Sequence, residues 1–142
     1  AGVAAAVQVC AVLAAAGRTL MVDECLEQVV KRVPGLREVL VTDRDGIVIM
    51  RYPPEDAGAT TPSGMEAAFS IAADQASKTY MGKCQAITAV YDNHVIVQVN
   101  DPPLVLSLVA DVDANVGSLV ALAPKLRDTL APLRDAVAKV SH

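Results

Sequence analysis

The chain has 142 residues, a hydrophobic fraction of 53% and a formal net charge of −4, which suits one domain with a sizeable core. Aromatic residues make up only 3% and Trp is missing, so large apolar anchors are few. Because the sequence has no run of Lys or Arg, it gives no support for nucleic-acid binding or for a basic helix on a membrane surface.

The first 20 residues differ from the rest. Residues 1–17 carry no charge and consist mostly of Ala and Val. This stretch is short for a transmembrane helix, which needs about 20 strongly apolar residues, and no basic segment precedes it as in a signal peptide. We expect residues 1–20 to be an upstream or artificial leader outside the fold, with an unrecognised targeting segment as the alternative. Residues 21–142 are expected to form the domain.

The first predicted element is a helix over residues 22–33, where apolar residues recur at helical spacing. The Pro34-Gly35 pair ends it. Two strands rich in Val, Leu and Ile follow, Leu36–Val41 and Ile47–Tyr52. The turn Asp43–Gly46 lies between them, with Asp at its start and Gly where a positive φ is needed, and it predicts a hairpin.

Residues 53–64 contain three prolines and two glycines and are predicted to form a surface loop. A helix over Met65–Tyr80 comes next. Three strands follow it, over Cys84–Tyr91, His94–Asn100 and Leu104–Ala110. The last of these is an almost continuous apolar run, which is typical of a strand buried on both faces.

The final element is an amphipathic helix over residues 119–137, whose apolar residues recur at steps of three and four. It contains two prolines. We expect Pro124 to mark the first position of a helix, and Pro132 to kink the helix or leave a carbonyl unbonded. The element order α-β-β-α-β-β-β-α predicts an α/β domain with a five-stranded antiparallel sheet and helices on both faces.

The middle helix has a wider apolar surface than its own domain needs. On a period of 3.6 residues, its apolar side chains cover roughly half of the circumference, whereas one core-facing stripe needs about 100°. The surplus predicts a second protein surface and favours a binding module over a catalyst. The residues are Met65, Ala68, Phe69, Ile71, Ala72, Ala73, Ala76 and Tyr80.

Catalysis and cofactor binding have little support. The three cysteines are too widely spaced for a disulfide framework or a zinc site, and no glycine-rich phosphate-binding motif occurs. We therefore predict no metal, no cofactor and no enzymatic activity. The alternative is a small enzyme that uses Cys84 and His94, which lie on consecutive predicted strands. Asp43 and Asp45 are explained by the chemistry of their turn.

Four stretches, taken together at their spacing, resemble one known family. They resemble the MEK-partner scaffold subunits of the Ragulator complex, which are late endosomal and lysosomal adaptors of roadblock/longin type. The resemblance runs from Met21 to about Val140. The stretches are Thr42-Asp43-Arg44-Asp45-Gly46, Asp74-Gln75-Ala76-Ser77-Lys78, Val97-Gln98-Val99-Asn100 with Pro103-Leu104-Val105, and Ala114-Asn115-Val116-Gly117.

The resemblance implies a non-enzymatic adaptor that forms a heterodimer with a sister roadblock subunit and joins other Ragulator subunits. It implies support of MEK–ERK signalling, and of Rag GTPase-dependent activation of the TOR kinase complex by amino acids. The expected location is the cytoplasm and the cytoplasmic face of late endosomes and lysosomes. Membrane attachment would come indirectly, through a lipidated partner subunit.

The resemblance further implies that the middle helices of the two subunits pack together and that the two sheets join edge to edge. Alanines would allow close approach, Phe69 and Tyr80 would act as anchors, and the strand Cys84–Tyr91 would form the joining edge. Packing of each alanine on its own sheet is the alternative. The expected interface consists of Ala68, Phe69, Ala72, Ala73, Ala76, Tyr80, Ile87, Ala89 and Tyr91.

The chain also departs from the family pattern. The departures are the two prolines of the last helix, Asp111 and Asp113 in place of a small hydroxyl-rich stretch, and the loop over residues 53–64. They leave open which surfaces contact kinases or other Ragulator subunits. A homodimeric roadblock module that acts on a small GTPase or a dynein motor is the alternative function.

Overall fold

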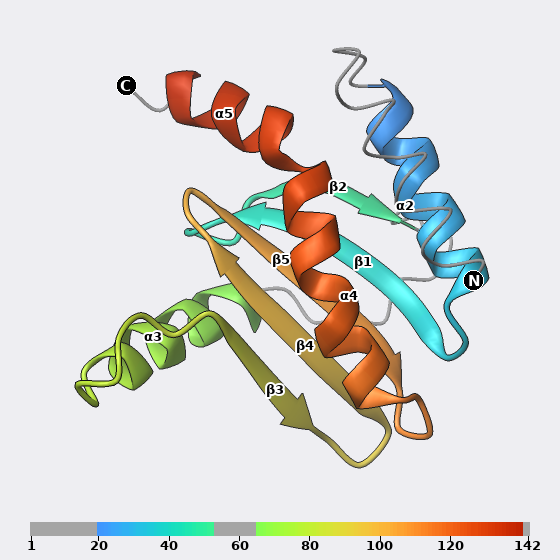
Figure 1. Ribbon diagram of the computed structural model, residues 1–142, viewed down its shortest axis with the longest axis horizontal. Helices are drawn as coiled ribbons and strands as arrows, with labels where there is room; N and C mark the ends of the chain where they lie inside the picture. Colours follow the sequence, from blue (N-terminus) through green and yellow to red (C-terminus); the bar gives the residue numbers. More distant parts are fainter. Residues whose placement is uncertain (1–19, 53–64, 141–142) are drawn as a thin grey trace.

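The computed structural model describes residues 20–52 and 65–140, so the predicted leader up to residue 19 and the predicted loop 53–64 lie outside the described residues. Five strands form one antiparallel sheet in the order β2-β1-β5-β4-β3, with helices on both faces (Figure 1), which confirms the predicted fold class. The elements are α2 (Leu20–Arg32), β1 (Leu36–Asp43), β2 (Val48–Tyr52), α3 (Met65–Ser77), β3 (Ala86–Val90), β4 (His94–Asp101), β5 (Leu104–Asp111), α4 (Val116–Thr129) and α5 (Ala131–Val140).

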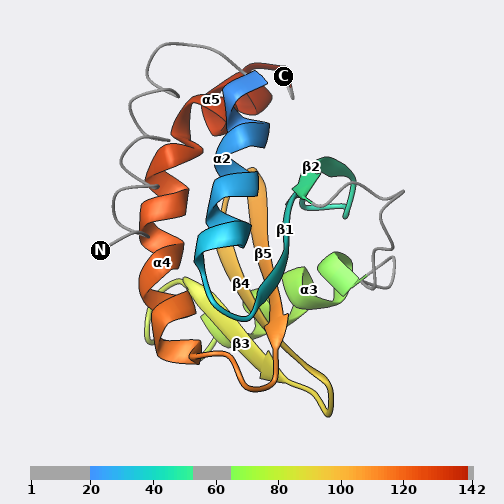
Figure 2. The same cartoon turned by 90° about the vertical axis from the view of Figure 1, so that its right-hand side faces the viewer.

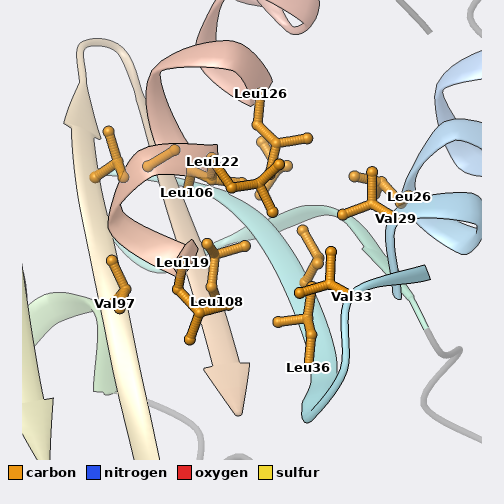
Figure 3. Close-up of a cluster of buried hydrophobic side chains, with 14 of the residues drawn as sticks. Leu26, Val29, Val33, Leu36, Val97, Leu106, Leu108, Leu119, Leu122 and Leu126 are labelled. Carbon is orange, nitrogen blue, oxygen red and sulfur yellow. The ribbon is translucent and has the colours of Figure 1, made fainter. Parts of the chain in front are cut away.

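The two faces of the sheet carry layers of very different size. Helices α2 and α4 cover one face, and α3 lies on the other (Figure 2). On the first face, leucines and valines of α2 and α4 converge on the sheet around Leu108 and Val97 (Figure 3). On the second face, Phe69 of α3 joins a small buried cluster with Leu40, Ile96 and Val109, and Met65 of α3 packs against it while partly buried. The α2–α4 side therefore holds the main core, and the α3 layer is thin.

Strand β5 lies at the centre of the sheet, between β1 and β4. Every residue from Leu104 to Ala110 is buried, which confirms the prediction of a strand covered on both faces. The predicted turn between β1 and β2 is also confirmed. Asp43 Oδ1 accepts hydrogen bonds from the N–H groups of Asp45 and Ile47, at 2.9 Å each, and Gly46 has a φ of 88°.

Helix α3 ends at Ser77, before the predicted end at Tyr80. The reason is that two hydroxyl side chains bond to carbonyls at the end of the helix and compete with its backbone hydrogen bonds. Ser77 Oγ donates to the Ala73 carbonyl at 2.9 Å, and Thr79 Oγ1 donates to the Ala76 carbonyl at 2.8 Å. Tyr80 then has a φ of 65°, in the left-handed region, and lies in the turn towards β3.

The predicted last helix is two helices, α4 and α5, which are separated at Leu130. Pro124 lies inside α4, so the prediction of a first helical position was wrong; the residue is exposed, where water can satisfy the carbonyl left without a donor. Pro132 was expected to kink the helix or leave a carbonyl unbonded; it instead lies in the first turn of a second helix, α5, where a missing N–H costs little.

Arg134 Nη1 donates to both Asp101 carboxylate oxygens, at 3.0 and 3.1 Å, and this pairing raises the pKa of Arg134.

Candidate protein-binding surface

Strand β3 forms one free edge of the sheet, as the family resemblance implied, although it is shorter than the predicted range Cys84–Tyr91. Its side chains alternate between two environments. Ile87 and Ala89 are half-buried and pack against the cluster below α3, whereas the residues between them are exposed. The strand therefore has one face that belongs to the domain and one that is open to solvent.

The free edge also exposes backbone groups. The Asn100 N–H donates to the Gln85 carbonyl at 2.9 Å, and the Tyr91 N–H donates to the His94 carbonyl at 2.8 Å. In an antiparallel pair, residues that bond to the neighbouring strand alternate with residues whose N–H and C=O point away from it. Since residues 85 and 91 bond to β4, the residues two positions along do so as well. The residues whose backbone groups point away from β4 are Ala86, Thr88 and Val90.

One surface ion pair reports how α3 is rotated over the sheet. Asp74 Oδ1 lies 3.8 Å from Nη2 of Arg44, which belongs to the β1–β2 turn, so this flank of α3 faces the β1–β2 side of the sheet, away from β3. At about 100° per residue, Ala68 and Ala72 lie on roughly the opposite flank of the helix. Both alanines are exposed. The exposed alanine flank of α3 and the free backbone of β3 therefore face the same side of the molecule.

The predicted interface residues fall into two groups in the structure. Phe69 and Ala73 are 8% and 7% exposed and belong to the core of the chain itself. Ile87 and Ala89 are half-buried under α3, where they pack against the small cluster that contains Phe69. For these four residues, the structure shows packing on the chain's own sheet. The exposed members of the predicted set are Ala68, Ala72, Ala76, Tyr80 and Tyr91.

Two strongly exposed apolar residues of this region were missed by the sequence-based interface. Val90 is 69% exposed and Met81 is 86% exposed. The alternation of β3 was the available signal for Val90, because it lies on the opposite face from Ile87 and Ala89. Met81 gave a weaker signal, its place next to Gly82 in a turn, since methionine is usually buried.

The structure does not bring Cys84 and His94 together. Cys84 precedes β3, where its thiol lies 3.5 Å from the Ala86 carbonyl, whereas His94 begins β4 opposite Tyr91. The two residues lie at opposite ends of the β3–β4 hairpin, roughly 20 Å of extended chain apart. In residues 20–52 and 65–140, no group of three or more His, Cys, Asp or Glu side chains is placed to hold a metal ion. No helix in that same part of the chain is long and apolar enough to cross a membrane.

Comparison with known proteins gives a family and relatives. Residues 21–137 match the family described as mitogen-activated protein kinase kinase 1 interacting. The chain is 37% identical to the Ragulator complex protein LAMTOR3-B of Xenopus laevis over 122 residues, which cover 82% of this chain and 98% of the relative. It is 34% identical to the Ragulator complex protein LAMTOR3 of Homo sapiens, with the same coverage of both chains. These names describe complex subunits and kinase-interacting proteins, in agreement with the prediction of a protein that is not an enzyme.

Solved structures support the fold independently. The chain is similar to a roadblock/LC7 domain from Streptomyces avermitilis, with a TM-score of 0.64 and 18% identity over 78% of this chain and 95% of that chain. It is also similar to the gliding protein MglB of Thermus thermophilus, with a TM-score of 0.63 and 17% identity over 80% and 87% of the two chains. These likenesses show a roadblock fold and carry no further argument.

Proposed function

The chain belongs to the mitogen-activated protein kinase kinase 1 interacting family and is a homologue of the Ragulator complex protein LAMTOR3, and from this premise we propose that it is an adaptor that binds a sister roadblock subunit through α3 and β3. The two α3 helices would pack along their small-residue flanks. The two β3 strands would pair across the free edges, so that the sheets of both subunits become continuous.

The observation that carries this proposal is that the exposed alanines of α3 and the outward backbone groups of β3 lie on the same side of the molecule. Exposed Ala68 and Ala72 on α3 permit close approach of a facing helix, because their side chains are short. On the same side, the outward backbone groups of β3 lack partners from the sheet of the chain itself. A partner with the same architecture has its own α3 and β3 in the same relative positions, so its helix can pack on the alanines while its strand pairs with the free edge of β3.

In this proposal the heterodimer acts by bringing other proteins together. As part of Ragulator on the cytoplasmic face of late endosomes and lysosomes, it would hold MEK and ERK near each other and support recruitment of Rag GTPases for amino-acid activation of the TOR kinase complex. A lipidated partner subunit would supply the membrane attachment. Such an adaptor needs no chemistry of its own, because holding two proteins on one assembly raises their effective concentration.

Proline at position 88 tests the strand pairing. The Thr88 N–H points away from β4, so Thr88→Pro removes no hydrogen bond of the sheet itself but deletes a donor that the partner strand would use. We expect the dissociation constant for the sister roadblock subunit to rise about tenfold to a hundredfold, which corresponds to one lost bond and a local steric conflict. Isothermal titration calorimetry with the purified sister subunit measures the change.

The matched control is Thr88→Ala, which alters the same exposed side chain but keeps the N–H group. It should change the dissociation constant by less than about threefold. Circular dichroism and thermal melting of both variants show whether the free chain remains folded. Equal affinities of the folded proline and alanine variants would mean that β3 does not pair with the partner strand.

A further inference from the structure

The loop between α3 and β3 extends past the sheet at its β3 edge (Figure 1). It carries two consecutive large apolar side chains at its tip. Tyr80 is 100% exposed and Met81 is 86% exposed, the two highest values among the large apolar residues of the described chain. The aromatic ring of Tyr80 and the side chain of Met81 are apolar surface exposed to water, and on a monomer such surface is a liability for non-specific association.

The base of this loop is fixed by a single hydroxyl group. Ser77 Oγ donates to the Ala73 carbonyl at 2.9 Å and accepts the N–H of Cys84 at 3.0 Å, which joins the end of α3 to the chain that enters β3. The next residue is held as well, because Gln85 Oε1 accepts a hydrogen bond from Arg127 Nη1 at 3.0 Å. Both ends of the loop are thus attached to the rigid part of the domain.

The backbone of the tip has a defined conformation. Tyr80 has a φ of 65° and Gly82 a φ of 93°, both in the left-handed region. Residues other than glycine rarely adopt a positive φ, and those that do are found most often at functional sites, where the surrounding structure holds the strained backbone. Here the two left-handed residues bracket Met81 and leave it and Tyr80 on the outside of the turn.

We propose that the loop Lys78–Lys83 is a preformed anchor that inserts Tyr80 and Met81 into an apolar pocket of the sister roadblock subunit. This inference rests on the proposed heterodimer, since the loop continues the side of the molecule formed by the α3 flank and the β3 edge. Lys78 and Lys83 are exposed on either side of the tip, so the pocket is expected to have an acidic rim. Tyrosines that fill a partner's pocket are frequent sources of binding energy, and a preformed loop loses little entropy on binding.

The test is the double variant Tyr80→Ser/Met81→Ser, titrated with the purified sister subunit. We expect its dissociation constant to be at least tenfold higher than that of the unaltered chain, mainly through faster dissociation. The fold of the free chain should be unaffected because both side chains are exposed. The control is Val112→Ser, which removes a 45% exposed apolar side chain in the β5–α4 turn and should leave the affinity unchanged.

A second measurement tests Ser77 as a positioning residue. Ser77→Ala removes both bonds at the base of the loop and should weaken binding several-fold, whereas Ser77→Thr keeps a hydroxyl and should restore most of the affinity. In the Tyr80→Ser/Met81→Ser background, Ser77→Ala should cause no further loss. An equal loss in both backgrounds would show that Ser77 only supports the fold, and would overturn its positioning role.

The outcomes separate the anchor from the heterodimer itself. If the unaltered chain does not bind the sister subunit, the proposed function is wrong. If the unaltered chain binds and the folded Tyr80→Ser/Met81→Ser variant binds equally well, the heterodimer stands and the anchor is wrong.

Discussion

Replacement of both Ala68 and Ala72 by glutamate is expected to abolish heterodimer formation while the chain stays folded. Both positions are exposed in the free chain, so the new carboxylates remain hydrated there. In the proposed complex they would lie between two packed helices without cationic partners, and burial of an unpaired charge costs several kcal/mol. We expect the dissociation constant to rise more than about a hundredfold, to the limit of detection by titration calorimetry or analytical ultracentrifugation.

The matched control is Val112→Glu, which places the same charge on an exposed apolar residue away from α3 and β3. It should leave the affinity within about threefold of the unaltered chain. Retained binding by the folded Ala68→Glu/Ala72→Glu variant would place the interface on another element. An equal loss for both variants would instead indicate a general effect of added negative charge.

Leu108→Ala is expected to have the largest effect on the stability of the free chain. Leu108 is 0% exposed and lies in the main core between the sheet and α4. Truncation of such a leucine removes its contacts and leaves a cavity, and it costs about 3 kcal/mol, within a range of 2–5. Urea denaturation of the variant and the unaltered chain measures the difference in free energy of unfolding.

Val109→Ala is the matched comparison, because Val109 is the next residue along β5 and faces the thin α3 layer instead. Its truncation removes less apolar volume from a smaller cluster, and we expect a loss of roughly half that of Leu108→Ala. A loss as large as that of Leu108→Ala would mean that the α3 layer contributes as much to stability as the α2–α4 side.

Addition of the sister subunit should raise the midpoint of unfolding, since a partner that binds only the folded chain stabilises it.

Strand positions were predictable because each strand is rich in Val, Leu or Ile and turn residues mark its ends. Asp43 and Gly46 illustrate this, since their roles in the turn follow from side-chain bonding and a positive φ. The end of α3 was not predictable in the same way. It depends on the Ser77 hydroxyl, which bonds both to a helix carbonyl and to the chain entering β3, and this second contact exists only after folding.

The binding surface on α3 was likewise predictable only in part. The width of the apolar arc on α3 indicates that some of it must face a second partner, but periodicity does not say which part. Phe69 and Ala73 are buried in the chain's own core, whereas Ala68 and Ala72 are exposed. The choice is made by how α3 is rotated on the sheet, which a long-range contact between Arg44 and Asp74 reports.

The last helix illustrates the limits of local rules for proline. Pro132 does not kink a single helix as expected but lies in the first turn of a new one, a position that local rules also allow for proline. Pro124 lies inside a helix against those rules, since the leucines before and after it, Leu122 and Leu126, are buried in the same core and hold both sides of the helix against the sheet. Tertiary packing outweighs the local cost of the missing N–H at this exposed position.

The most direct measurement is the mass of the complete chain in solution, alone and mixed with its sister roadblock subunit, by light scattering on a sizing column. We expect a stable one-to-one complex in the mixture, with the chain alone monomeric or poorly soluble because its α3 flank and β3 edge lack a partner. A stable homodimer that ignores the sister subunit would contradict the proposed heterodimer and favour the self-associating module instead.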